Sequence, residues 1–211
     1  MSGEKPSGAI LLVVSGPGGA GKSTLCEQLV ADDCYGALSI SATTRPPRGA
    51  ERHGVHYFFL EREEFEKRIA AGGFAEHAEV AGHFYGTPRD FLDEKLAAGV
   101  DVVLDIDVQG AMQVRAAYGD RAVLVFVIPP SRAVLEQRLR GRGTDSDERI
   151  AERMALAERE IEAARSGGYD YLVVNDALDA ALDELMAIRG AEHNRVSREG
   201  SRAAWVLRTW T

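Results

Sequence analysis

Short apolar runs alternate with amphipathic stretches along most of the chain. Near-continuous apolar runs are typical of strands that are covered on both faces of a parallel sheet. Five of them predict strands, at 10–14, 38–41, 102–106, 123–128 and 171–174. Apolar residues at helical spacing predict helices at 23–30, 89–98, 108–118, 132–140, 147–166 and 178–189. The alternation of strands and helices predicts an α/β fold with right-handed crossovers between parallel strands.

The alternation is interrupted between residues 39 and 87. This segment holds polar turns, an aromatic run at 56–59 and an amphipathic stretch at 63–71 that predicts a short helix. We therefore expect a small α+β insertion in the α/β core.

Composition narrows the class of protein. The chain has 211 residues, of which 45% are hydrophobic, which is enough for a substantial core. Its apolar runs are all much shorter than the ~20 residues that span a bilayer, and residues 1–8 are polar, unlike a secretory signal. Two cysteines are too few for a disulfide framework or a metal site. We expect a cytoplasmic protein without a membrane partner.

The chain is acidic as a whole but has two arginine-rich stretches. The net charge of −8 disfavours a general nucleic-acid surface. Arginines nevertheless gather in two stretches, at 45–52 and 132–153. An acidic chain that concentrates arginines in this way is expected to bind anions there. The two stretches are also expected to repel each other until anions lie between them, which predicts an open site in the empty protein.

A glycine-rich segment, GPGGAGKS at 16–23, follows the first predicted strand and opens the first predicted helix. Glycines let backbone N–H groups turn towards an anion, and a helix N-terminus favours negative charge. Lys22 adds a mobile cation, and the Ser23 hydroxyl can hold Mg²⁺. The pattern G-x-x-x-x-G-K-[ST] in this context predicts a nucleoside triphosphate site. The alternative is a solvated glycine-rich turn.

Two further stretches carry candidate chemistry for a second substrate. Arg45 and Arg48 lie three residues apart with prolines between them, which favours a stiff fork for a phosphate, although a solvated basic turn is the alternative. In GFAEHAEVAGHFYGT at 73–87, the Glu76 carboxylate can accept hydrogen bonds from the N1–H and N2–H₂ groups of guanine. Tyrosine hydroxyls nearby can donate to a phosphate, but each tyrosine alone could equally be a packing residue.

The stretch VVLDIDVQG at 102–110 ends an apolar run in acids. A carboxylate at the end of such a strand fits the metal-supporting acid of P-loop enzymes. Period-two alternation predicts that Asp105 and Asp107 point to the same face of the strand. The alternative is that both acids cap the following helix.

Taken together, these motifs resemble a known family. GPGGAGKST, SISATTRPPRGAERHGVHYFF, FAEHAEVAGHFYGTP, VLDIDVQG and LRGRGTDSDERIAERM, in this order, resemble guanylate kinases over residues 9–192. The resemblance implies a P-loop NTPase fold, a three-layer αβα arrangement with a central parallel sheet, to which a GMP-binding insertion and a helical lid are added. It implies a core at 9–38, 88–130 and 160–192, an insertion at 39–87, a lid at 131–159 and a tail at 193–211.

The resemblance also implies an activity and a set of site residues. The activity would be Mg²⁺-dependent transfer of phosphate from ATP to GMP, with dGMP as a further acceptor. The GMP phosphate would contact Ser41, Arg45, Arg48, Tyr57 and Tyr85, and the guanine base would contact Glu76, Thr87 and Asp107. ATP would contact Gly16, Pro17, Gly18, Gly19, Ala20, Gly21, Lys22, Ser23, Thr24, Arg138, Arg142 and Asn175, the last near the adenine. Catalysis would rest on Lys22, Arg48, Arg138, Arg142 and Arg153, and Mg²⁺ on Ser23 and Asp105.

The sequence departs from the family in two places. Gly18 stands where the family commonly has serine, so one hydroxyl contact to phosphate is missing. The tail carries both tryptophans, Trp205 and Trp210, in WVLRTW. This alternation is typical of a short strand, the alternative is a segment that packs on a neighbour, and the role of the tail is not indicated.

Two alternative functions remain at this stage. One is a protein-binding module that has lost catalysis, although such modules typically lose the P-loop lysine or the lid arginines, which are retained here. The other is a related kinase with a different phosphorylated acceptor. The sequence does not decide between a monomer and a homo-oligomer.

Overall fold

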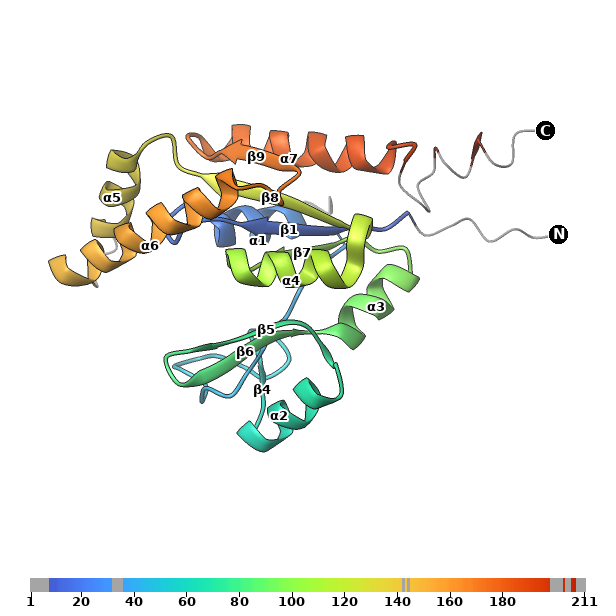
Figure 1. Ribbon diagram of the computed structural model, residues 1–211, viewed down its shortest axis with the longest axis horizontal. Helices are drawn as coiled ribbons and strands as arrows, with labels where there is room; N and C mark the ends of the chain where they lie inside the picture. Colours follow the sequence, from blue (N-terminus) through green and yellow to red (C-terminus); the bar gives the residue numbers. More distant parts are fainter. Residues whose placement is uncertain are drawn as a thin grey trace.

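The computed structural model describes residues 8–31, 36–141, 143, 145–197, 203, 206 and 207. It contains two sheets and the helices around them (Figure 1). No helix among these residues combines the length and the apolar character needed to cross a membrane.

The larger sheet has five parallel strands in the order β2-β7-β1-β8-β9. Its strands are β1 (Leu11–Ser15), β2 (Ala37–Leu38), β7 (Val102–Asp105), β8 (Ala122–Ile128) and β9 (Tyr171–Val174). β1 and β8 are buried almost throughout, as their apolar sequences predict. The expected strand at 38–41 is shorter, because the chain leaves this sheet after Leu38.

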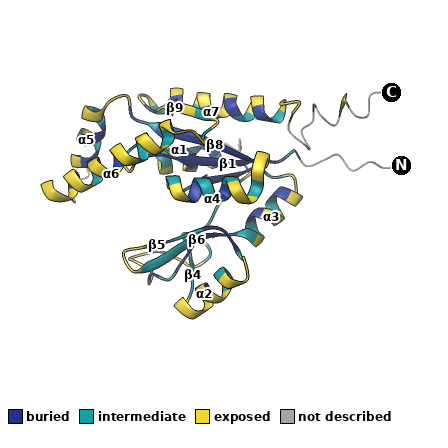
Figure 2. Cartoon of the chain, in the orientation of Figure 1, coloured by how far each residue is buried: buried dark blue, intermediate teal, exposed yellow. Residues whose placement is uncertain are grey.

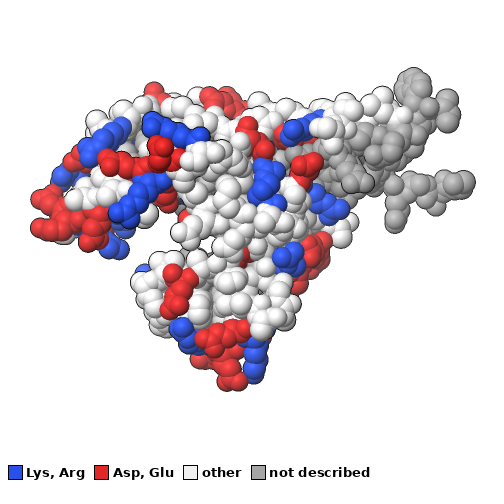
Figure 3. Space-filling model, in the orientation of Figure 1, with Lys and Arg blue, Asp and Glu red and all other residues white. Residues whose placement is uncertain are grey.

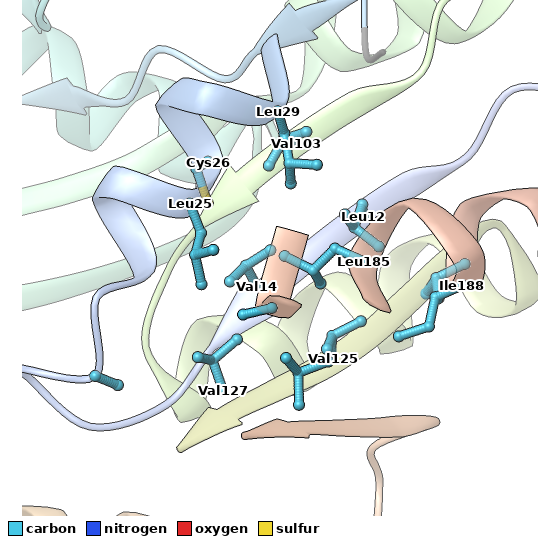
Figure 4. Close-up of a cluster of buried hydrophobic side chains, with 14 of the residues drawn as sticks. Leu12, Val14, Leu25, Cys26, Leu29, Val103, Val125, Val127, Leu185 and Ile188 are labelled. Atoms are coloured by element: carbon cyan, nitrogen blue, oxygen red, sulfur yellow. The ribbon is translucent and has the colours of Figure 1, made fainter. Parts of the chain in front are cut away.

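Helices cover both faces of this sheet, which gives three layers (Figure 1). On one face α1 (Lys22–Ala31) and α7 (Leu178–His193) pack on alternate strand residues, among them Leu12, Val14 and Val125 (Figure 4). On the other face α3 (Arg89–Ala97) and α4 (Val108–Tyr118) bury Leu11, Val13 and the opposite residues of the neighbouring strands. The predicted α/β fold with a central parallel sheet is therefore confirmed.

The second sheet has the order β4-β3-β6-β5 and lies beside the core (Figure 1). Its strands are β3 (Ala42–Thr43), β4 (Phe58–Phe59), β5 (Phe74–Val80) and β6 (His83–Pro88), and α2 (Arg62–Ala70) packs against it. The buried Phe65 of α2 stacks between Phe74 and Phe84, with ring centroids 4.2 and 5.4 Å apart. These three rings form a small core of their own.

Helices α5 (Arg132–Arg140) and α6 (Asp147–Arg165) pack against each other at one end of the core. Their apolar contact is made by Leu135, Leu139, Ile150, Met154 and Ala157, while their outer surfaces are exposed (Figure 2). The two helices therefore form a thin, mostly polar arm beside the main core.

The opposite end of the large sheet holds a buried carboxylate. Asp101, which precedes β7, accepts hydrogen bonds from the Ile10 N–H at 3.0 Å and from Arg189 Nε at 2.7 Å, and its Oδ2 lies 2.8 Å from His193 Nε2. Burial raises the pKa of this carboxyl, but these partners outweigh burial and the net shift is downward. Asp101 thus joins the starts of β1 and β7 to the end of α7.

Little of the expected tail lies among the described residues. Val206 and Leu207 have helical backbone, so the expected strand is wrong for these two residues. Trp205 and Trp210 lie outside the described residues.

Candidate functional site

The glycine-rich loop lies between β1 and α1, at the carboxyl edge of the large sheet. Gly16, Gly19 and Gly21 have φ values of 139°, 101° and 91°, which other residues rarely adopt. A Cβ at Gly16 would lie 2.1 Å from the carbonyl oxygen of Val127 in β8. The loop therefore needs glycine there for its conformation and for its close approach to the neighbouring strand. Ligands of parallel sheets bind at this edge.

Asn175 supports this loop from the end of β9. Its Nδ2 donates a hydrogen bond to the Ala20 carbonyl at 2.8 Å, and its own carbonyl accepts one from Arg138 Nη2 at 2.9 Å. The side chain is buried against Gly21. The structure thus gives Asn175 a role in holding the loop that the sequence did not indicate. Its expected place near the adenine stays a prediction.

Lys22 and Ser23, at the end of the loop, have different partners: Lys22 contacts the loop itself and Ser23 contacts β7. Lys22 Nζ lies 2.6 Å from the Gly16 carbonyl and 3.3 Å from that of Pro17, so it folds back over the loop. Ser23 Oγ donates a hydrogen bond to Asp105 Oδ2 at 2.6 Å. A hydroxyl and a carboxylate at this spot are the hard oxygen ligands that Mg²⁺ prefers, and Mg²⁺ usually completes its shell with phosphate oxygens and water. Among the described residues, no group of three or more metal-ligating side chains surrounds the spot.

Asp105, the last residue of β7, and Asp107, which follows the strand, have different partners. The strand ends at Asp105, so the prediction that Asp105 and Asp107 share a strand face is wrong. Asp107 is the N-cap of α4, and its Oδ1 accepts a hydrogen bond from the Gly110 N–H at 2.7 Å. The capping alternative therefore holds for Asp107, whereas Asp105 faces Ser23.

Glu76 and Thr87 face each other across β5 and β6, where they are register partners. Thr87 Oγ1 donates a hydrogen bond to Glu76 Oε1 at 2.6 Å, and both residues are buried. Burial raises the pKa of the Glu76 carboxyl, with a further upward effect from Asp107, and the Thr87 bond opposes them. A Cβ at Gly110 would lie 3.0 Å from Glu76 Oε2 and 3.4 Å from Asp107 Oδ1. The two expected base-reading carboxylates thus meet around one glycine.

The two arginines of the expected phosphate fork are used differently. Arg45 is buried and donates from Nη1 and Nη2 to both oxygens of Glu51, at 2.8 and 2.9 Å. Glu51 also accepts from the Arg48 N–H at 2.7 Å. The Arg45 guanidinium is the main cause that lowers the pKa of Glu51 to about 2. In this structure Arg45 holds the loop together, while Arg48 is exposed. The sequence assigned Glu51 no role, because an acid six residues after an arginine fits a solvated ion pair equally well.

A pocket of about 180 Å³ connects the two halves of the site. Ser23 and Asp105 line it from the core, and Ser41 and Tyr57 line it from the second sheet. The Tyr57 ring lies 5.3 Å from the Arg45 guanidinium and 6.2 Å from the Tyr85 ring. The structure therefore brings Ser41 and Tyr57, expected at the acceptor phosphate, to the same pocket as the expected metal ligands, whereas Arg48 does not line it.

The Arg153 side chain of α6 reaches the glycine-rich loop at residues 16–23, which is the P-loop. Arg153 Nη1 is 3.9 Å from the place of a Cβ at Gly18, so serine, the common family residue, would meet this guanidinium. Arg153 Nε also lies 3.1 Å from Asp145 Oδ2. Arg138 reaches the loop through Asn175, as described above. Arg142 lies outside the described residues.

The arginines of 132–153 are largely neutralised by acids. Ion pairs join Arg132 to Glu158, and Arg140 to both Glu136 and Asp147. Arg149 pairs with Glu152, so helical ion pairs account for Arg140 and Arg149. The expected repulsion between two bare cationic stretches is therefore wrong. Figure 3 shows positive and negative side chains interleaved over α5 and α6, and a notch between these helices and the second sheet.

Comparison with known proteins decides the family. The sequence model of guanylate kinase matches residues 9–191. The chain belongs to the guanylate kinase family. Curated guanylate kinases from Symbiobacterium thermophilum and Escherichia coli strain K12 are 51% and 49% identical to it, over 93% and 91% of this chain and 92% of each relative.

A solved structure supports the same assignment. The crystal structure of guanylate kinase from Anaplasma phagocytophilum has a TM-score of 0.73 and 31% identity to this chain. The match covers 98% of this chain and 97% of the other. As a member of the guanylate kinase family, the chain has the P-loop NTPase fold and is a nucleoside monophosphate kinase.

Proposed function

We propose that this protein transfers the γ-phosphoryl group of ATP to GMP, giving ADP and GDP, with Mg²⁺ bound together with ATP. The observation that carries the choice of acceptor is the arrangement of Glu76, Thr87 and Asp107 around Gly110. It places acceptor oxygens together, with Glu76 buried and Asp107 exposed, and guanine presents adjacent N–H donors on one edge. Adenine has no such pair of donors in that position.

Base recognition would rest on Glu76 Oε2, because Oε1 is already occupied by Thr87. A guanine that donates to this buried carboxylate would remove the cost of its burial and favour the ionised form. Asp107 would accept a further bond with the oxygen that does not cap α4. The site thus favours a ligand that brings donors.

The acceptor phosphate would lie in the pocket between the core and the second sheet. Arg48, Ser41, Tyr57 and Tyr85 would donate to its oxygens, and Arg45 would keep the loop in shape through Glu51. A phosphate oxygen of GMP is already an anionic nucleophile, so no general base is required. This explains why no histidine is needed among the proposed contacts.

Phosphoryl transfer then depends on positioning and on cations, since charge spreads over the oxygens of the moving group. Lys22, Arg138, Arg142 and Arg153 would surround the donor phosphates, with the backbone of residues 16–24 as their cradle. Mg²⁺, when bound at Ser23 and Asp105, would neutralise phosphate charge. These roles need Lys22 to leave the Gly16 and Pro17 carbonyls that it contacts in this structure.

We assign three parts to this reaction. Residues 9–38, 88–130 and 160–192 would form the nucleotide-binding core, and 39–87 the GMP-binding insertion. Residues 131–159 would form the lid, and 193–211 a tail to which no role is assigned. The separate hydrophobic clusters of the second sheet and of α5 with α6 support this division.

A coupled ADP-release assay tests the proposal with GMP, dGMP, AMP, CMP and UMP as acceptors, at fixed ATP and Mg²⁺. We expect turnover with GMP and dGMP and only background with the other three. Turnover with another nucleotide in preference to GMP would contradict the proposed acceptor. Tight GMP binding with no turnover would instead favour a binding module.

A further inference from the structure

One partly buried carboxylate near the P-loop, that of Glu160, has no role in the proposed reaction. Glu160 lies on α6, and its Oε2 is buried without a hydrogen-bond partner. Only two other buried side-chain atoms among the described residues lack such a partner, Arg153 Nε and Asp145 Oδ2, and these form an ion pair with each other. Buried polar groups without partners are rare and call for an explanation.

The position of Glu160 relates it to the nucleotide. It lies seven residues after Arg153, which is about two helical turns, so both project from the same face of α6. Arg153 lies over Gly18 on this face, and Met154 and Ala157 are buried between the two charged residues. On this face Met154 and Ala157 pack on α5, and Leu135 and Leu139 of α5 lie beside Gly19 of the P-loop.

Three groups from other segments act on Glu160 or respond to it. The charges of Lys22 in the P-loop and of Asp107 at the start of α4 shift the pKa of the Glu160 carboxyl. The pKa of Tyr169 is raised mainly by burial, with a further upward effect from Glu160. Tyr169 donates a hydrogen bond to Ser15 Oγ, directly before the P-loop, at 3.0 Å. Burial is the main cause that raises the pKa of Glu160 to about 7, with Lys22 lowering it and Asp107 raising it.

We propose that Glu160 is a positioning residue that couples nucleotide binding at the P-loop to the uptake of a proton by its own carboxylate. The inference rests on the proposed function in one respect, that the loop binds nucleotide phosphates. An ionised Glu160 competes with those phosphates for Lys22 and repels them. A neutral Glu160, formed by transfer of a proton from buffer to Oε2, no longer attracts Lys22 or repels the phosphates, and it offers an O–H donor.

The direction of the pH dependence follows from this competition. Phosphates near Glu160 add negative charge, so they raise its pKa further. Nucleotide affinity is therefore greatest where Glu160 is already neutral, and it falls as pH rises through about 7. Each unit by which the nucleotide raises the pKa gives about a tenfold loss of affinity at high pH.

Isothermal titration calorimetry with a non-hydrolysable ATP analogue and Mg²⁺ tests the proposal. The wild type, E160Q and the control E162Q are compared at about pH 6 and about pH 8.5, and in two buffers with different heats of ionisation. Glu162 is on the same helix, with its side chain 71% exposed, and pairs with Arg165. Because the ligand's own titration is common to all three proteins, differences between them report Glu160.

We expect the wild type to take up about half a proton more than E160Q per nucleotide near pH 7, since Glu160 is half-ionised there before binding. The wild type and E162Q should also lose about tenfold more affinity than E160Q between the two pH values. Identical proton uptake and pH dependence in E160Q and the wild type would overturn the proposal.

Other outcomes separate this inference from the proposed function. Wild-type protein that binds no analogue at either pH would contradict nucleotide binding itself. If E160Q does not fold, E160A takes its place in the same comparison, and proton uptake and pH dependence identical to those of the wild type would overturn the coupling. A loss of affinity in E160Q that is equal at both pH values would show a purely structural role and would also overturn it.

Discussion

At the scale of single residues, the site is built from carboxylates whose partners set what they can do. Glu51 is fully engaged by Arg45 and the Arg48 N–H, and its pKa is low. Glu76 is hydrogen-bonded to Thr87, without a cationic partner in the described part of the chain, and its pKa is raised by burial. The first is a structural anion, whereas the second awaits a ligand with donors.

Replacing Glu76 tests this difference. Glu76→Gln keeps the side-chain volume but removes the charge. Its amide N–H groups would face the N–H groups of guanine, and two donors cannot form a hydrogen bond with each other. With hydrogen bonds to a charged group worth about 3 kcal/mol, we expect roughly a hundredfold loss in kcat/KM for GMP. Glu79→Gln, an exposed change on the same strand, should leave it unchanged. Steady-state kinetics at varied GMP provide the measurement, and an unaltered value in Glu76→Gln would remove this residue from the base site.

The sequence predicted these residues unequally well. Glu76 and Asp107 could be singled out because their types match guanine, and the structure brings them together around Gly110. Glu51 could not be singled out, because an acid near arginines is usually a solvated ion pair. Its importance depends on the burial of Arg45, which is a property of the tertiary structure.

At the scale of elements, the start of α4 combines two functions. Asp107 caps the helix through the Gly110 N–H and also faces the proposed base site. An N-cap needs only an oxygen acceptor, whereas the base site would use the negative charge. Asparagine satisfies the first need without the second.

Two substitutions separate these functions. Asp107→Ala loses the cap, so we expect about 1 kcal/mol less stability together with weaker use of GMP. Asp107→Asn should keep most of the stability but still raise the KM for GMP. Thermal unfolding and acceptor kinetics on the same samples check both statements. Equal losses of stability in the two variants would mean that the cap does not stabilise α4 in this way.

The elements of the core were more predictable than those of the insertion. Long apolar strands and amphipathic helices carry their own periodic signal, and α4, α5 and β9 have the predicted bounds. β3 and β4 have two residues each, too few for any period to show. Their pairing depends on Phe65 and its aromatic neighbours, which lie far apart along the chain.

At the scale of the whole molecule, the two edges of the large sheet have different properties. The carboxyl edge carries the site, with polar groups that await partners. The amino edge carries Asp101, whose partners are Ile10, Arg189 and His193. The folded-state pKa of Asp101 is below its ordinary value, so its contribution to stability is present above about pH 4 and is lost as pH falls through the lower folded-state pKa.

Asp101→Asn should therefore remove part of the acid sensitivity. At neutral pH we expect a loss of about 1–3 kcal/mol, because charged hydrogen bonds become weaker or unmade. Below about pH 4 the difference from the wild type should shrink. Denaturant unfolding across this range measures it, with Asp183→Asn, an exposed change on α7, as the control. A difference that stays constant with pH would exclude the charge of Asp101 as its source.

The separation of the proposed substrate contacts predicts motion of whole parts. Lys22 and Glu76 belong to different sheets, and a notch separates the second sheet from α5 and α6 (Figure 3). Phosphoryl transfer requires donor and acceptor to meet with water excluded. Small-angle scattering should show a smaller radius of gyration with GMP, and a smaller one still when a non-hydrolysable ATP analogue is added. An empty protein as compact as the doubly liganded one would contradict closure.

The glycine between Glu76 and Asp107 also limits how this protein can change over evolutionary time. Gly110 belongs to a core helix, yet a side chain there would intrude on a carboxylate of the second sheet. An exchange of the segment 39–87 between relatives would work only where the recipient keeps a residue this small at the start of α4. The insertion and this helix turn are therefore expected to be inherited together, although more than twenty residues separate them in the sequence.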